Sequence, residues 1–248
     1  MANSELEKYM YPFEKREKMR THPTYEAIKE PWENGLYATS QKVGSLSYLI
    51  RDAHQKVQAK GRDSLTRANW GKYYLNTGKI RLDKKAEQTS DDYYKINKYN
   101  GRTLDDLLEI AKAFYKDCTD NYGIKLTPQA ALNIVYMKVV DDTFTEYQRN
   151  INTILNLKSK LPEYTFELTD GLTYDNNAVD VIVSLKGDIV GGLQILPESA
   201  KNKEQKQSKM KSEVDQKHDL FEMMCGVRPQ KIYASSTGYM KNPVPSFD

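Results

Sequence analysis

Two side chains with oxygen donors, Asp180 and Gln194, interrupt two successive apolar runs of the sequence. Aspartate is depleted in strands and is rarely buried without a partner, so its position among β-branched residues needs an explanation. The turn residues Lys186-Gly187-Asp188 separate the two runs, which predicts a hairpin with strands over 178–185 and 189–196. Adjacent strands would bring the two polar groups together. Because Mg²⁺ prefers carboxylate and carbonyl oxygens, the pair predicts a divalent-cation site.

A lysine-rich segment follows the predicted hairpin directly. Between Ala200 and His218 six lysines accompany three acidic residues, and this local excess of +3 equals the net charge of the whole chain. A basic segment beside a metal site fits a polyanionic substrate whose phosphates need neutralising. The alternative is an ordinary solvated helix face. The lysines expected to contact such a substrate are Lys201, Lys203, Lys206, Lys209 and Lys211.

The N-terminal part of the chain changes from a polar arm to helices. Residues 1–37 are polar and are interrupted by three prolines, which predicts an arm with at most a short helix over 25–29. From Ser40 the apolar positions follow helical spacing, and this serine can cap the first helix. A second helix is predicted over 63–75.

Two further helices have recognisable starts. The string TLDD, beginning at Thr103, places a cap and an acid three residues later, as in a capping box. Thr127-Pro128 supplies a cap and a first-turn proline for the next helix. That helix either continues through 144–157 or breaks at 141–143, and Pro162 ends it.

After Pro162 the hydrophobic period changes from helical to alternating. The sequence predicts a strand over 164–168, the hairpin, a lysine-rich helix over 208–225 and a last strand over 231–235. This order indicates an α/β or α+β fold with a mixed sheet. We expect a helical N-terminal region over 1–125 and an α/β core over 126–248, or one compact domain that contains both.

Composition excludes several functional classes. Mean hydropathy is −0.75 and 29% of residues are charged, and no run approaches the roughly 18 apolar residues of a membrane span. The N-terminus lacks the apolar core of a signal peptide, so we expect a cytoplasmic protein with no membrane partner. The two cysteines form no CxxC pattern, and the strings GxxxxGK[ST], HExxH and GxSxG are absent.

The arrangement around Asp180 and Gln194 resembles the core of PD-(D/E)xK nucleases. In that family an acid on one strand, and an acid or glutamine two residues before a lysine on the next, hold Mg²⁺ and a water against the scissile phosphate. The resemblance implies that Asp180 is the first acid and that Gln194-Ile195-Leu196 is the triplet.

Leu196 departs from the family pattern, because it stands where the family has its lysine. An ammonium there stabilises hydroxide and the charge that builds on the phosphate in the transition state, and leucine does neither. Three explanations remain open. Lys201 or Lys203 has taken over the role, the chain is an inactive form, or the alignment is wrong.

Three strings extend the resemblance to type II restriction endonucleases of the MjaI kind. GLQILPES, followed by a polar helix and KIYAS, is similar to the catalytic end of that family, and ATSQKVGSLSYLI and TFTEYQRN are similar to its helical part. Glutamates from a core helix often join the metal site in PD-(D/E)xK nucleases. The resemblance therefore adds Glu146 as a third metal ligand, although a surface glutamate is the alternative.

Asp180 has a non-functional interpretation too, as an edge-strand aspartate that faces solvent. Strand alternation places Asp180 with Ile182 on one face, and Val179 with Val181 and Val183 on the other. A half-polar face explains the residue without a metal.

Taken with the resemblance, these residues lead us to expect a Mg²⁺-dependent type II restriction enzyme that cuts double-stranded DNA as a homodimer. The alternative is a non-catalytic DNA-binding protein that keeps the fold with a degenerate site. Leu196 is the residue that keeps this alternative open.

Overall fold

A computed structural model describes residues 7–39, 43, 45–62, 64–85, 103–169, 178–201, 213–240 and 245–247, with side chains only up to Thr77 in the helix that reaches Lys85. The chain divides into two compact units, Met1–Thr143 and Phe144–Asp248. This division falls inside the long helix α11 (Asp142–Lys160), whereas the sequence placed the boundary between residues 125 and 126.

The first unit begins with short helices where an arm was expected. They are η1 (Glu7–Tyr9), α2 (Phe13–Met19), α3 (Pro23–Ala27) and α4 (Lys29–Asn34). The expectation of one short helix was wrong because the prolines start helices here instead of interrupting them. Pro12 precedes α2 and Pro23 opens α3, positions at which the missing N–H of proline costs nothing.

Two longer helices follow in the same unit. Helix α6 (Leu46–Gln58) begins after Ser45, and the predicted cap Ser40 lies outside the described residues. Helix α7 (Arg67–Lys85) begins four residues later than predicted and extends beyond the predicted end at Leu75.

The predicted starts of the next two helices are confirmed. Helix α9 (Leu104–Asp120) has the Thr103–Asp106 capping box, and α10 (Pro128–Tyr136) is capped by Thr127. After α10 the helix does not end at 141–143, but its α-helical geometry is interrupted at 137–141. A π-helical turn, η2 (Met137–Asp141), connects α10 to α11, which ends at Lys160 before Pro162.

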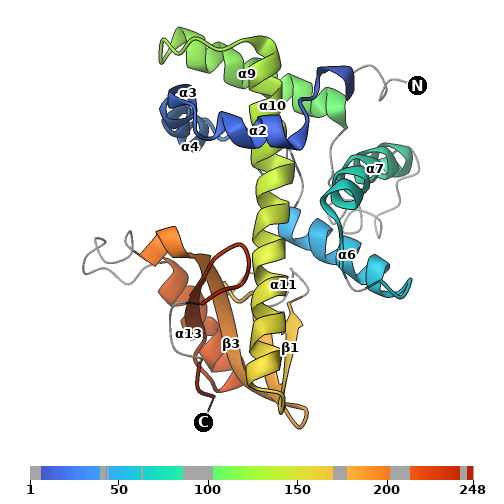
Figure 1. Cartoon of the computed structure of the whole chain (residues 1–248), viewed down its shortest axis with the longest axis vertical. Coiled ribbons are helices and arrows are strands. Elements are labelled where there is room, and N and C mark those ends of the chain that lie inside the picture. Colours follow the sequence, from blue (N-terminus) through green and yellow to red (C-terminus); the bar gives the residue numbers. More distant parts are fainter. Residues whose placement is uncertain are drawn as a thin grey trace. The chain divides into compact units, whose positions relative to one another are not determined.

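The second unit contains a four-stranded mixed sheet, as predicted. Strands β1 (Tyr164–Leu168), β2 (Val181–Leu185) and β3 (Asp188–Pro197) pair antiparallel in sequence order, and β4 (Gln230–Ala234) pairs parallel with β3. The short helix η4 (Glu198–Ala200) follows β3, and α13 (Glu213–Cys225) precedes β4. Helix α11 runs along the sheet in Figure 1.

Two apolar clusters cover the two faces of the sheet. On one face Ile154 and Leu157 of α11 pack against side chains of all four strands, and on the other Phe221 of α13 packs against Val179 and Ile182. Val179 was expected beside Val181 and is on the opposite face. The reason is local, because the regular strand begins only at Val181 and Ala178 has a left-handed φ of 57°.

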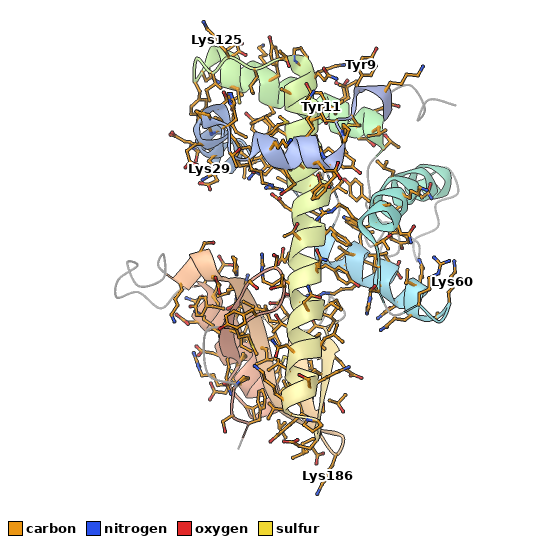
Figure 2. The ribbon with its side chains drawn as sticks, viewed as in Figure 1. Tyr9, Tyr11, Lys29, Lys60, Lys125 and Lys186 are labelled. Atoms are coloured by element: carbon orange, nitrogen blue, oxygen red, sulfur yellow. The ribbon has the colours of Figure 1, made fainter. Side chains whose placement is uncertain are left out.

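The β2–β3 hairpin is confirmed, with a two-residue turn. Lys186 and Gly187 have φ of 53° and 97°, the two positive values that a type I′ turn requires. Leu185 pairs with Asp188 to close the turn. Lys186 projects from the tip of this hairpin in Figure 2, so Asp180 and Gln194 belong to its opposite end. Within the described part of the chain, no helix has the length and apolar character that crossing a bilayer demands.

Candidate functional site

Asp180 is fixed between the strands on either side of β2. Its N–H donates to the carbonyl of Leu193 at 2.8 Å, and its own carbonyl accepts from the N–H of Thr169 at 3.0 Å. Its carboxylate Oδ2 accepts from the N–H of Ile195 at 2.8 Å. Because β2 lies inside the sheet, between β1 and β3, Asp180 does not lead into an edge strand, as its non-functional interpretation assumed.

Gln194 lies directly beside Asp180 on β3. Asp180 donates to the carbonyl of Leu193 and accepts from the N–H of Ile195, and these two residues lie on either side of Gln194. Gln194 is half-buried, and no described residue donates a hydrogen bond to its buried Oε1. A buried carbonyl oxygen without a donor is unfavourable in a protein interior, so Gln194 Oε1 is suited to accept from a bound water or to bind a cation.

Lys231 is a neighbour of Gln194 that the sequence analysis did not identify. The two residues pair across the parallel strands β3 and β4, so their side chains leave the sheet on the same face. The ammonium Nζ of Lys231 lies 3.9 Å from the carboxylate Oδ1 of Asp215 on α13. Only the parallel pairing of β4 with β3 creates this neighbourhood, and the sequence pattern of a short strand does not encode it.

His218 of α13 is a second group that the sequence did not single out. It is 2% exposed and hydrogen bonds to the carbonyl of Ala178, two residues before Asp180. Burial lowers the pKa of His218, and the charges of Lys231 and Arg228 lower it further, whereas the Ala178 bond and Asp215 act in the opposite direction. A neutral imidazole therefore holds the segment that leads into Asp180.

The charges of the predicted ligand Glu146 and of Asp180 both act on Arg149. Glu146 and Arg149 belong to α11, and Glu146 is exposed whereas Arg149 is half-buried. Burial lowers the pKa of Arg149, while the negative charges of Glu146 and Asp180 raise it. The guanidinium of Arg149 thus interacts electrostatically with both carboxylates. No described residue accepts a hydrogen bond from its buried Nε.

Lys201 lies near Tyr233, the strand partner of Leu196. Leu196 pairs with Tyr233 across β3 and β4, and the ammonium Nζ of Lys201 lies 5.9 Å from the centroid of the Tyr233 ring. Lys201 is exposed, immediately after η4. The other predicted DNA contacts lie outside the described residues, namely Lys203, Lys206, Lys209 and Lys211.

The donor set at this end of the hairpin has the chemistry of a hard-cation site but few carboxylates. Asp180 supplies carboxylate oxygens and Gln194 supplies a buried amide oxygen. Among the described residues, no group of three or more His, Cys, Asp or Glu is arranged to hold a metal ion. Mg²⁺ keeps several waters and often uses only one or two carboxylates together with substrate phosphates, so the pair fits such an ion.

The chain was compared with known protein families, curated proteins and solved structures. No protein-family model, curated protein or solved structure matches the chain.

Proposed function

We propose that the protein is a Mg²⁺-dependent endonuclease that hydrolyses phosphodiester bonds of double-stranded DNA, in the manner of a type II restriction enzyme. The observation that supports this proposal is the hydrogen bonding of Asp180 to Leu193 and Ile195, the two chain neighbours of Gln194, at one end of the β2–β3 hairpin. The mixed sheet and the residues around this pair agree with the resemblance to PD-(D/E)xK nucleases found in the sequence.

In this proposal Asp180 and Gln194 would hold the metal ion, which would supply Lewis-acid activation of the phosphate. The bond from the Ile195 N–H fixes one carboxylate oxygen of Asp180 and therefore its orientation. Glu146 is the third candidate ligand. Its charge acts on the same guanidinium, Arg149, as that of Asp180.

Lys201 takes the role of the family lysine. Its ammonium stabilises the hydroxide that forms when a water loses a proton, and this hydroxide attacks the phosphorus. The P–O bond to the leaving oxygen breaks, and this oxygen takes up a proton from solvent, which also receives the proton that the attacking water loses. Lys201 is preferred over Lys231 because Lys201 lies beside Tyr233, the strand partner of Leu196.

The proposed substrate is duplex DNA, and the proposed assembly is a homodimer. The lysines that follow Lys201 in the sequence provide positive charge for the backbone phosphates. A two-fold dimer matches the symmetry of a palindromic site and places one catalytic site on each strand.

The experiment is DNA cleavage by the wild-type protein and two matched variants. Long unmethylated DNA of varied sequence is incubated with Mg²⁺ and separated on a gel. Asp180→Asn keeps an oxygen that can accept from Ile195 but removes the charge, and we expect it to lose at least about 100-fold in rate. The control Asp188→Asn alters an exposed aspartate at the other end of β3 and should cut like wild type. Equal cutting by both variants would contradict the proposal.

One observation favours the non-catalytic alternative. Leu196 occupies the position of the family lysine. A DNA-binding protein with a degenerate site would show binding that weakens steeply with salt, without cleavage at any Mg²⁺ concentration.

A further inference from the structure

Three polar side-chain atoms of α11 are buried and have no hydrogen-bond partner among the described residues. They are Nε of Arg149, Oδ1 of Asn150 and Oγ1 of Thr153. Buried polar atoms in proteins are almost always hydrogen bonded, so each exception needs an explanation. Asn150 and Thr153 are 4% and 0% exposed, whereas Arg149 is half-buried. Of the three, Arg149 is therefore the side chain that a large ligand such as DNA can touch.

The direction of α11 places Arg149 toward the end of the sheet at which Asp180 lies. The chain reverses between α11 and β1 over residues 161–163, so the two elements run in opposite directions (Figure 1). Strand β2 is antiparallel to β1 and therefore runs in the same general direction as α11. Asp180 directly precedes β2. Ile154 and Leu157 follow Arg149 and pack on the sheet, so Arg149 belongs to the part of α11 that lies toward the start of β2.

A hydrogen bond to the segment after β4 supports this placement. Nδ2 of Asn152 donates to the carbonyl of Ser236, two residues beyond the end of β4, at 2.9 Å. Strands β3 and β4 are parallel and therefore end on the same side of the sheet, and antiparallel pairing with β3 brings the start of β2 to that side. Arg149 lies about one turn before Asn152 on α11. The electrostatic interaction between Arg149 and Asp180 agrees with this position.

The chemistry of the Arg149 side chain suits a phosphate group. Burial lowers the pKa of Arg149, but a guanidinium keeps its proton in proteins, so the side chain remains cationic. Its planar fork of N–H groups matches pairs of phosphate oxygens. The Nε of Arg149, from which no described residue accepts a hydrogen bond, is one of the donors of this fork. A phosphate group held beside Asp180 can accept from these donors.

From its place at the Asp180 end of the sheet, we propose that Arg149 is a further catalytic residue, which donates hydrogen bonds to non-bridging oxygens of the phosphodiester group that is hydrolysed. This inference rests on the proposed nuclease function. Negative charge builds on the phosphate in the transition state, so donors that are already in position there lower the barrier. Arg149 exchanges no proton with the substrate, and the bonds that form and break are those of hydrolysis by water.

The alternative role of Arg149 is to balance the charges of Asp180 and Glu146 without touching the substrate. The two roles differ in their effect on the Mg²⁺ dependence of cleavage. A guanidinium is a cation and opposes the binding of Mg²⁺ near the same carboxylates. Its removal should lower the Mg²⁺ concentration for half-maximal cleavage in either role, but the maximal rate falls only if a contact to the phosphate is lost.

Two variants of Arg149 and one control separate these roles. Arg149→Gln removes both the charge and the fork of donors. Arg149→Lys keeps the charge but replaces the fork by a single ammonium group. The control Lys158→Gln removes a cation from an exposed position in the last turn of the same helix. Urea unfolding establishes which variants are folded.

The test is a Mg²⁺ titration of DNA cleavage by the full-length wild-type protein and the three variants. We expect the maximal rate to fall at least about 100-fold in Arg149→Gln and about tenfold in Arg149→Lys, and to stay unchanged in Lys158→Gln. A wild-type maximal rate in Arg149→Gln overturns the inference and leaves the nuclease proposal standing. If Arg149→Gln does not fold, a wild-type maximal rate in Arg149→Lys has the same meaning. A wild-type protein that does not cut DNA overturns both.

Discussion

The backbone N–H of Ile195 donates a hydrogen bond of 2.8 Å to the carboxylate Oδ2 of Asp180. An aspartate side chain thus completes the pairing of β3 at a point where the regular strand β2 has not yet begun. This bond gives Asp180 a structural role in addition to the proposed catalytic one, and the two roles can be separated by experiment.

Replacing Asp180 by alanine removes the acceptor of the Ile195 N–H and should lower the free energy of unfolding by about 1–3 kcal/mol. Asparagine retains an oxygen acceptor, so Asp180→Asn should cost less than Asp180→Ala. Urea unfolding of the two variants and of the wild-type protein measures both values. Equal stability of all three proteins would show that the bond contributes nothing to folding.

The buried His218 predicts a dependence of stability on pH. Burial lowers the pKa of His218 in the folded state. Below pH of about 6.5 the unfolded state therefore binds a proton more strongly than the folded state does. The free energy of unfolding is therefore unaffected by this group above that pH, and it decreases as the pH falls below it. Burial also lowers the pKa of His54, which adds to the same trend.

Between pH of about 7.5 and about 5.5, His218→Gln should therefore lose less stability than the wild-type protein, by no more than about 1.4 kcal/mol. Urea unfolding at the two pH values measures the difference. The same pH dependence in His218→Gln and wild type would contradict the assignment of a neutral buried imidazole.

Two adjacent aspartates in the first unit should differ in their effect on stability. Asp141 is 1% exposed and pairs with Arg16, whereas Asp142 is 35% exposed and pairs with Arg20. Removing one partner of a buried pair leaves an uncompensated charge, so Asp141→Ala should cost about 3–5 kcal/mol. Asp142→Ala should cost about 1 kcal/mol or less. Thermal and urea unfolding compare the variants, and equal losses would refute the distinction.

Local sequence signals were sufficient for much of the second unit. The strand over 164–168, the hairpin turn at Lys186-Gly187 and the last strand are encoded by alternation and turn residues within a few positions. The capping box at Thr103 is equally local. These elements could be predicted because the residues that determine them are adjacent in the chain.

Contacts between distant segments could not be predicted. Arg16 and Asp141 are separated by 125 positions, and no local sequence pattern predicts that they form an ion pair. The position of Lys231 beside Gln194 depends on a parallel crossover through α13, and that of Arg149 near Asp180 depends on how α11 packs on the sheet. The short helices around Pro12 and Pro23 were missed because proline both interrupts and starts helices.

The central claim is that Asp180, Gln194 and Lys201 form one catalytic site. The most direct test moves the lysine from position 201 to position 196 and measures the rate of DNA cleavage. DNA cleavage with Mg²⁺ is measured for the wild-type protein, Lys201→Ala, and Lys201→Ala combined with Leu196→Lys. The account predicts a loss of at least about 100-fold in Lys201→Ala and recovery of most of that loss in the double variant. An unchanged rate in Lys201→Ala, or no recovery with lysine at position 196, would contradict it.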